Sequence, residues 1–448
     1  MKFVYPQAAR AGVNRRQRRT TMASFYIPLS GLDADSTALN TIANNLSNMN
    51  TTSFKAQTTN FSDLFYQQVG TSGSGNAIQM GEGVQVASNE TDFSQGSYDT
   101  SGTTTSDVAL DGSGFFVVSN GGSNVYTRDG DFTQNTNGNL VTADGLAVMG
   151  YPAVNGVVNT DAPLTAINIP LIGQVQQPQA TTSFSMTANL DSTAPLNTSF
   201  PASVAIFDSL GVPHTATVTY QETGLNTWSY SAALPAADFT SGVSTPITGT
   251  LNFDENGDLT TVTPTGGAAT PVGAAVGDIS SIPLSFTGLT DGAADLNIGW
   301  NLLGTSGTPT VSQEDSTTTL SAAPANGFAT GVYQGFAIGS DGTVTASYSN
   351  GQQQAVGQLA VANVTNLQGL AIEGNGNFAT TLASGTASIG ASGTGGLGTI
   401  QDSALEESNV NISAEFSDLI IAQRGFEANS KAITTFDTIT QETINMIH

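Results

Sequence analysis

The pattern of hydrophobic and polar positions divides the chain into two helical ends and a long middle of strands. Between residues 28 and 49, leucines recur every seven residues and therefore lie on one face of a helix. The same period returns between residues 411 and 447, where it continues for longer. At about 1.5 Å per residue, the second helix is roughly 55 Å long, more than the width of a small domain. We therefore expect it to pack against other helices.

The apolar positions define two candidate assembly seams, one on each terminal helix. A seven-residue repeat of apolar side chains favours the packing of one helix against another in a shallow, coiled-coil-like supercoil. The N-terminal seam is Leu32, Leu39, Ile42, Leu46 and Met49. The C-terminal seam is Ile412, Phe416, Leu419, Phe426, Ile433, Ile444 and Ile447. The alternative is that both helices only cover the β core of a monomer.

Between about residues 93 and 398, the chain changes to short alternating runs of β-branched and aromatic residues. Such alternation is typical of strands, and the Asn-Gly and Asp-Gly pairs between the runs supply the positive φ angles that tight hairpins require. Three similar units, at residues 135–140, 254–259 and 340–344, are therefore predicted to be hairpins.

Breaks in composition near residues 163–178 and 316–326 indicate that one β domain is inserted into another. The predicted fold class is mainly β with long terminal α-helices, in a nested multidomain arrangement. The predicted segments are a basic leader (1–21), an N-terminal helix and connector (22–92), an inner β domain in two pieces (93–165 and 326–398), an inserted outer β domain (166–325) and a C-terminal helix (399–448).

Charge and composition narrow the class of protein. The chain has 10 basic and 35 acidic residues, a formal charge of −25, which repels nucleic acids and anionic lipid surfaces. No apolar run approaches the 18 or so residues that a membrane-spanning helix needs. Cysteine is absent, so neither disulfides nor thiolate metal sites are available. A composition rich in Thr, Ser, Asn and Gly, with few charged residues, suits an extracellular β-rich protein.

The first 21 residues differ from the rest because they contain no Asp or Glu and carry most of the basic residues. We expect that translation begins at Met22 and that the leader is not native. The alternatives are a disordered basic arm and a targeting signal. The Arg-Arg-Gln-Arg-Arg run at residues 15–19 is similar to a twin-arginine signal, but no apolar stretch follows it.

The motifs that suggest chemistry lack the context that a site needs. Gly393-Thr-Gly-Gly-Leu-Gly matches a nucleotide-binding pattern, but that pattern binds phosphate only between a strand and a helix. The turn at residues 254–258 lacks the carboxylates and the closing Glu of a calcium loop. His214 is expected to be a hydrogen-bonded residue at the surface or at a sheet edge, and His448 ends the chain. We predict no catalytic, cofactor-binding or metal residues and no enzyme, although a glycosidase-like pair of carboxylates stays open.

Three blocks of motifs occur in order along the chain. The first is Leu39-Asn-Thr-Ile-Ala-Asn-Asn-Leu-Ser-Asn, followed by Thr52-Ser-Phe-Lys-Ala. The second contains Tyr126-Thr-Arg-Asp-Gly-Asp-Phe-Thr. The third contains Leu405-Glu-Glu-Ser-Asn-Val-Asn and Ile421-Ala-Gln-Arg-Gly-Phe-Glu-Ala-Asn. Together these blocks resemble the axial proteins of the bacterial flagellum, the rod and hook proteins of the basal body.

The middle of the chain resembles the hook proteins within that group. Phe207-Asp-Ser-Leu-Gly-Val-Pro-His-Thr-Ala-Thr-Val is similar to a strand pair of their outer domain, and residues 339–351 are similar to the return into their inner domain. The resemblance implies a terminal helical domain from both chain ends, an inner β domain and an inserted outer β domain. It also implies a subunit that polymerises into a curved flexible tube, a universal joint that transmits torque from the rod to the filament.

The resemblance further implies partners and a location. The partners would be other copies of the chain, the distal rod protein, the hook cap, the hook–filament junction proteins and the flagellar type III export apparatus. Members of the family leave the cell unfolded and without a cleaved signal peptide, which implies an extracellular location. The alternatives are a distal rod or hook–filament junction protein and, more distantly, an extracellular β-sandwich adhesin.

Overall fold

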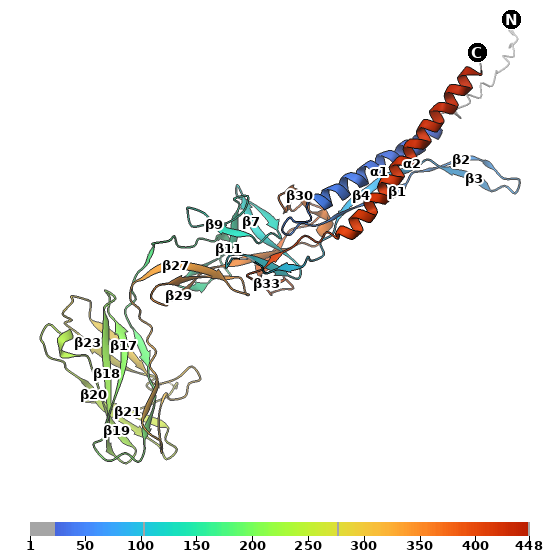
Figure 1. Cartoon of the computed structure of the whole chain (residues 1–448). Coiled ribbons are helices and arrows are strands. Elements are labelled where there is room, and N and C mark those ends of the chain that lie inside the picture. Colours follow the sequence, from blue (N-terminus) through green and yellow to red (C-terminus); the bar gives the residue numbers. More distant parts are fainter. Residues whose placement is uncertain (1–22, 102–103, 276, 447–448) are drawn as a thin grey trace, which may run out of the picture. The chain divides into compact units, whose positions relative to one another are not determined.

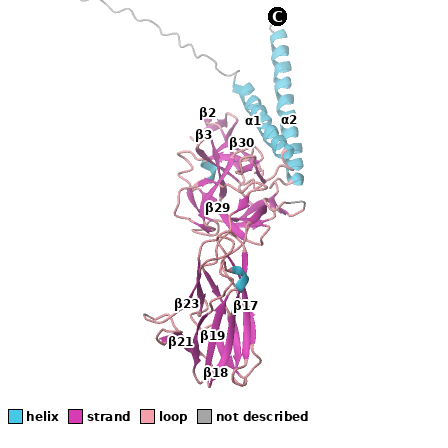
Figure 2. Ribbon diagram, turned by 90° about the vertical axis from the view of Figure 1, so that its left-hand side faces the viewer, coloured by secondary structure: helices cyan, strands magenta, loops and turns pink. Residues whose placement is uncertain are grey.

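The computed structural model describes residues 23–101, 104–275 and 277–446. The predicted leader (1–21), its expected boundary at Met22, the seam residue Ile447 and the terminal His448 lie outside the described residues. Figure 1 labels the elements along the chain, and Figure 2 shows that helices form the chain ends and strands the regions between them. The predicted fold class, mainly β with long terminal helices, is confirmed.

The chain forms two compact units, which we call the terminal unit and the inserted unit. The terminal unit contains the residues up to Ile169, Ala337–Val344 and the residues from Ala355 onward, whereas the inserted unit contains Pro170–Phe336 and Thr345–Gln354. Because both terminal helices and the inner strands fall within one unit, the finer domain boundaries drawn from the sequence stay predictions.

Helix α1 (Ala23–Ser47) begins before Pro28, where the sequence places its start. A proline lacks the amide N–H and is tolerated best in the first turn of a helix, which favours a start near Pro28. In the structure Pro28 is instead buried inside the helix. At the other end, the amide of Asn48 donates to the carbonyls of Asn44 and Asn45 before the chain turns. The predicted end in this asparagine-rich segment is confirmed.

Helix α2 (Ile412–Asn445) matches its predicted range within two residues at each end. Its start is fixed by Asn411, whose side-chain oxygen accepts hydrogen bonds from the amides of Ser413 and Ala414. These amides belong to the first turn, where no carbonyl of the helix can satisfy them. The cap and the seven-residue period therefore agree on the same helix.

Helices α1 and α2 pack side by side and run antiparallel (Figures 1 and 2). The amide of Asn45 donates to Glu415 at 2.9 Å, near the end of α1 and the start of α2. At the opposite end, the rings of Phe25 and Phe436 lie 5.8 Å apart. Residues 437–446 of α2 therefore extend past the described part of α1.

The β part of the terminal unit is built mainly from antiparallel strands. Neighbouring strands follow the order β29-β11-β7-β8-β31-β30, and β1 pairs with β4 beside α1. The strands are β1 (Gln57–Asp63), β2 (Tyr66–Thr71), β3 (Ala77–Gly81), β4 (Val84–Thr91), β5 (Tyr98–Asp99), β6 (Val108–Asp111), β7 (Phe115–Asn120), β8 (Ser123–Thr127), β9 (Phe132–Gln134), β10 (Leu140–Thr142), β11 (Ala147–Val154), β12 (Val157–Val158), β13 (Thr165–Ala166), β30 (Ala371–Gly374), β31 (Asn377–Ala379), β32 (Ser388–Ala391), β33 (Thr399–Asp402) and β34 (Leu405–Glu406). A 3-10 helix, η2 (Leu367–Gly369), precedes β30.

The core of the terminal unit lies around β7. The four residues from Phe115 to Val118 are all buried, because β7 has neighbours on both sides and is covered on both faces. The ring of Phe115 packs against those of Phe93 and Phe378, with centroids 5.8 Å and 5.6 Å away. This core supports the strands to which the two chain ends attach.

The inserted unit contains an antiparallel sheet in the order β17-β18-β19-β20-β21-β22. Its alternating pattern buries large side chains such as Tyr220, Trp228 and Tyr230. Two smaller sheets, β15-β24-β23 and β25-β16-β26, supply further buried residues, including Trp300, to the same core. Successive side chains of a strand point to opposite faces of the sheet. In the large sheet, the side chains that alternate with the buried ones are mainly Ser and Thr.

The strands of the inserted unit are β14 (Val175–Gln176), β15 (Ser183–Ser185), β16 (Thr187–Asp191), β17 (Ser199–Phe207), β18 (Pro213–Gly224), β19 (Thr227–Ala233), β20 (Ile247–Phe253), β21 (Leu259–Pro264), β22 (Thr270–Pro271), β23 (Ser281–Phe286), β24 (Leu296–Asn301), β25 (Val311–Glu314) and β26 (Thr319–Ala322), with the 3-10 helix η1 (Ala236–Asp238). Three strands contain residues of both units: β27 (Gly331–Ile338), β28 (Thr343–Tyr348) and β29 (Gln353–Asn363).

All three predicted hairpins are confirmed. They join β9 to β10, β20 to β21 and β27 to β28. Their glycines Gly138, Gly257 and Gly342 have φ angles of 88°, 84° and 81°, the left-handed region that favours glycine. The nucleotide-like motif that starts at Gly393 is a turn between β32 and β33, so it does not lead into a helix.

Candidate assembly surface and the junction of the chain ends

Around Gly31 and Gly425, the contact face between α1 and α2 is made of small and polar side chains. A Cβ atom on Gly31 would lie 2.6 Å from Nδ2 of Asn429, and one on Gly425 would lie 2.9 Å from Oδ2 of Asp35. The amide of Asn429 donates to Asp35 at 2.9 Å. The two helices therefore approach closely, and hydrogen bonds rather than large apolar residues join them here.

The N-terminal seam lies beside this face and not within it. The buried residues of α1 include Ala34, Thr41 and Asn45. The seam residues Leu32, Leu39, Ile42 and Leu46 are half-buried, whereas Met49 lies beyond the end of α1 and is exposed. The seven-residue period identified apolar positions on one flank of the helix, while the contact with α2 uses the neighbouring small residues.

The C-terminal seam is more exposed still. Three of its members, Leu419, Phe426 and Ile433, are half-buried. Ile412, Phe416 and Ile444 are 45%, 49% and 54% exposed, and Ile447 lies outside the described residues. As assembly contacts, both seams stay predictions. Within the described chain, however, these apolar side chains are only partly covered.

Sequence reasoning missed further exposed apolar residues on α2. Ile420, Ile421 and Ile439 are 49%, 68% and 54% exposed, and Met446 is 80% exposed. They fall between the seven-residue positions, so the period gave no signal for them. Their exposure suggests that more than one face of α2 is available to partners.

A groove lies between α1, β1 and α2. It encloses about 330 Å³ and is lined by the apolar residues Ile42, Phe61 and Ile421 and by the acidic residues Glu415 and Asp418, among others. Burial, assisted by the nearby Asp418, raises the pKa of Glu415 against the opposing hydrogen bond from Asn45. The groove is therefore lined by both apolar side chains and carboxylates.

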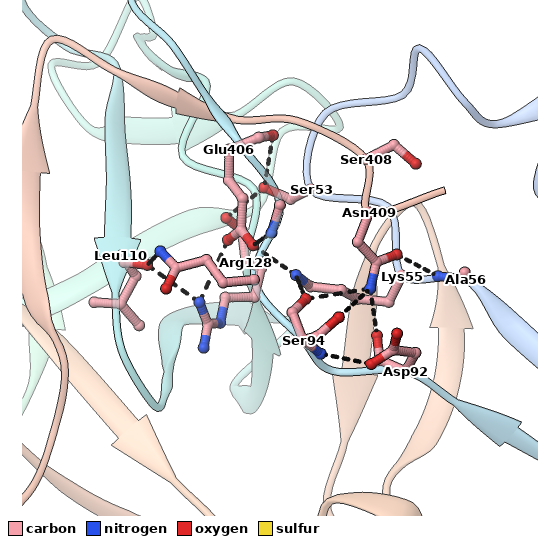
Figure 3. A network of polar contacts seen from close by, with 12 residues as sticks. Ser53, Lys55, Ala56, Asp92, Ser94, Leu110, Arg128, Glu406, Ser408 and Asn409 are labelled. Carbon is pink, nitrogen blue, oxygen red and sulfur yellow. Dashed lines mark hydrogen bonds and ion pairs between the residues drawn. The ribbon is translucent and has the colours of Figure 1, made fainter. Parts of the chain in front are cut away.

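A buried polar network joins the two chain ends to the β core (Figure 3). The carboxylate of Glu406, on β34, accepts from Lys55 Nζ at 2.5 Å and pairs with Arg128 Nη1 at 3.3 Å. The amide of Gly96 also donates to Glu406, at 2.9 Å. Burial lowers the pKa of Lys55, and the hydrogen bond and charge of Glu406 oppose that shift.

Backbone contacts extend the network. The Ser53 amide donates to the carbonyl of Glu406 at 2.7 Å, and the Ser53 hydroxyl donates to the carbonyl of Arg128 at 2.8 Å. The side chain of Asn409 accepts from the Ala56 amide and donates to the carbonyl of Asp92, both at 2.8 Å. The segment that follows α1 and the segment that precedes α2 are thus fixed side by side.

The residues of this network come from the three motif blocks of the sequence. Lys55 belongs to the Ser-Phe-Lys motif, Arg128 to the Tyr-Thr-Arg-Asp-Gly motif, and Glu406 and Asn409 to the Leu-Glu-Glu-Ser-Asn motif. The sequence showed no reason for these motifs to meet, because 278 residues separate Arg128 from Glu406 and 351 separate Lys55 from Glu406. Their contact gives a physical reason for these residue types in the three motifs.

His214 is hydrogen-bonded, as expected, but it is buried and does not lie at the surface, since it is only 6% exposed. At this position β18 pairs with β17, and its pairing with β19 begins at Thr217. The ring of His214 contacts the carboxylates of Asp208, Asp238 and Asp291. The sequence missed this cluster because the three aspartates come from a turn, a 3-10 helix and a loop at irregular spacing.

Across the described residues, neither helix has the length and apolarity required to cross a membrane. This finding agrees with the sequence, where no long apolar run occurs.

Comparisons with known proteins match most of the chain. Family models match as "Flagella basal body rod protein" at residues 25–55, "Flagellar hook protein FlgE/F/G D1 domain" at 109–189, "Flagellar basal body protein FlaE D2 domain" at 175–328 and "Flagellar basal body rod FlgEFG protein C-terminal" at 401–446.

Curated relatives are similar over nearly their full length. The flagellar hook protein FlgE of Escherichia coli K12 is 34% identical over 441 residues, which cover 94% of this chain and 100% of the relative. That of Treponema pallidum is 33% identical over 465 residues, covering 95% and 99%. The crystal structure of Helicobacter pylori flagellar hook protein FlgE2 has a TM-score of 0.50 at 14% identity, with 70% of this chain and 100% of that chain covered. This last likeness concerns the fold.

Proposed function

The chain belongs to the flagellar hook protein family and is a structural subunit of the bacterial flagellar hook, and we propose that its terminal helices carry the contacts between subunits. The family is structural, and we propose that this member has no catalytic role. The subunit would polymerise into the curved flexible tube that transmits torque from the rod to the filament.

The observation that carries the proposal is the partial exposure of the apolar residues on α2. Ile412, Phe416 and Ile444 are each roughly half-exposed on a helix that α1 approaches through small and polar residues around Gly31 and Gly425. Full burial of such a side chain contributes about 1.5–3 kcal/mol. Neighbouring subunits that cover the exposed halves would gain about half of this energy at each residue, and they would gain it repeatedly along a polymer.

We propose the individual partners from the membership of the hook protein family. They are further copies of the chain, the distal rod protein, the hook cap, the hook–filament junction proteins and the type III export apparatus. Export would proceed through that apparatus without a cleaved signal peptide, to an extracellular location. The absence of cysteine supports unfolded passage, because no disulfide can form before export.

A charge placed on the C-terminal seam tests the proposal. We expect Leu419→Asp and Phe426→Asp to block polymerisation of the purified subunit, since a carboxylate at a dry contact between helices is left unpaired. Sedimentation and electron microscopy measure polymer formation, and circular dichroism checks that the strands remain folded.

The matched control is Ala428→Asp. Ala428 is exposed on α2 and lies nine residues from Leu419, about half a turn around the helix. It adds the same charge on the opposite side, where the exposed Ile421 and Ile439 also lie, so continued polymerisation would assign the contact to the seam rather than to that side. Normal polymers from the Leu419→Asp and Phe426→Asp subunits would show that the seam is not an assembly contact.

A further inference from the structure

Three carboxylates converge on one buried imidazole in the inserted unit. His214, near the start of β18, has its Nε2 atom 3.3 Å from Oδ2 of Asp208 and 3.5 Å from Oδ2 of Asp291. Its Nδ1 atom lies 3.0 Å from Oδ2 of Asp238, in η1. Asp208 and His214 are buried, whereas Asp291 lies at the surface.

The carboxylates that face Nε2 are each held by their other oxygen. Oδ1 of Asp208 accepts from the amides of Leu210 and Val212, both at 2.8 Å. Oδ1 of Asp291 accepts from the amide of Ala293 at 3.0 Å. In both residues Oδ2 is therefore the oxygen that points to the histidine.

The separations match the edges of a coordination polyhedron. Bonds of about 2.0–2.2 Å from a tetrahedral zinc ion to nitrogen and oxygen place neighbouring ligand atoms roughly 3.3–3.6 Å apart. The distances from Nε2 to the two carboxylate oxygens, 3.3 Å and 3.5 Å, fall within that range. Asp208, His214 and Asp291 each offer one ligand atom, and these three atoms all lie within 4.8 Å of one another.

The remaining carboxylate occupies the place of an orienting partner. A histidine that binds a metal through one ring nitrogen generally donates the N–H of the other to a carboxylate or carbonyl, which fixes the tautomer. Asp238 accepts from Nδ1 in this position. Nε2 is then the unprotonated nitrogen, and it faces Asp208 and Asp291.

We propose that Asp208, His214 and Asp291 bind a divalent transition-metal cation of the zinc class, with Asp238 orienting the imidazole. One nitrogen and two carboxylate oxygens suit Zn²⁺, whereas Ca²⁺ and Mg²⁺ prefer oxygen alone. The exposed side at Asp291 gives the ion an entry path and leaves a fourth position for water. Bound metal would join η1 and the loop between β23 and β24 to the turn between β17 and β18.

A histidine binds a metal through an unprotonated ring nitrogen, so protons compete with the metal ion for the site. Binding is therefore best measured at about pH 8.

The test is calorimetric titration of Zn²⁺ into the full chain after treatment with a chelator. We expect one zinc ion bound per chain, with Ca²⁺ binding at least tenfold more weakly. Asp291→Asn should weaken zinc binding at least tenfold, and because Asp291 is at the surface the variant should unfold at nearly the wild-type temperature in chelator. Asp238→Asn should weaken binding about 10–100-fold, as the loss of an orienting partner does.

The matched control is Asp315→Asn, an exposed aspartate of the inserted unit outside the cluster. It removes one negative charge, and we expect zinc affinity to be unchanged. If the wild-type chain does not bind zinc, the proposal is overturned, and the three carboxylates surround a protonated histidine instead. Zinc binding of equal strength by wild type, Asp291→Asn and His214→Gln would overturn it as well.

Discussion

Removal of the negative charge from the junction network should destabilise the terminal unit strongly. Glu406→Gln keeps the shape of the side chain, so it leaves no cavity, but it removes the one carboxylate that pairs with Lys55 and Arg128. The side chains of these two cations are only 1% and 7% exposed. Breaking a buried ion pair by neutralising one partner costs about 3–5 kcal/mol.

Remaining hydrogen bonds place the expected loss at the lower end of that range. Lys55 still donates to the carbonyl of Ser94 at 2.8 Å, and Arg128 to those of Leu110 and Gly112 at 3.2 Å and 2.6 Å. We therefore expect a loss of about 3 kcal/mol, a large share of the roughly 5–15 kcal/mol that stabilises a typical domain.

The assay must separate the two units. Trp228 and Trp300 both lie in the inserted unit, so tryptophan fluorescence reports the unfolding of that unit. Hydrogen exchange of the amides of β7 reports the terminal unit. Glu407→Gln is the matched control, because Glu407 is the next residue and is exposed. Equal exchange in the two variants, or a loss under about 1 kcal/mol in Glu406→Gln, would refute the reasoning.

The pH dependence of the same variant has a definite sign. Burial lowers the pKa of Lys55 below its ordinary value, and without Glu406 nothing of comparable strength opposes the shift. Above the lowered pKa, the folded state binds fewer protons than the unfolded state, so stability rises with pH. The deficit of Glu406→Gln should therefore shrink between neutral and alkaline pH, and a constant deficit would contradict the charge argument.

Two further changes test the packing and the titration of the terminal unit. Gly425→Leu should drive α2 away from Asp35 and cost about 1–3 kcal/mol of stability, which is measured as faster hydrogen exchange in α1. The control Ala428→Leu, on the exposed side of α2, should leave the exchange unchanged. Unchanged exchange in both variants would contradict the close approach of the helices. Burial raises the pKa of Asp129 to about 6, so the folded state holds the proton more tightly and stability falls as the pH rises from about 4 to about 6. Asp129→Asn should thus resist urea better than wild type at pH 7 and equally below about pH 4; no gain at pH 7 would refute the burial argument.

Local patterns were sufficient to predict the extent of α2 and three hairpins. The seven-residue period predicts α2 within two residues at each end, and Asn-Gly or Asp-Gly pairs predict the hairpins. The start of α1 was the exception. A proline in the sequence predicts a helix boundary because it lacks the amide N–H of a helical hydrogen bond. In the structure, α1 continues through Pro28, which is buried, and Gly31 packs closely against Asn429.

Long-range chemistry was outside the reach of these patterns. Lys55 and Glu406 are separated by 351 residues, and only the fold brings them together. The carboxylates around His214 come from a turn, a 3-10 helix and a loop, so no regular spacing in the sequence indicates that they lie close together. A single sequence shows the residue types of such clusters, but it does not show which of 35 acidic residues will meet.

The terminal helices divide two tasks that the sequence alone could not separate. Small residues such as Gly31 and Gly425 let α1 and α2 approach closely, and a hydrogen bond from Asn429 to Asp35 joins the helices there. The larger apolar residues, such as Phe416 and Ile444, remain half-exposed beside it. If neighbouring subunits cover those residues, as we propose, each new contact also stabilises the packing of α1 against α2. Assembly and ordering of the chain ends would then reinforce one another, while the network around Glu406 keeps the ends fixed to the β core.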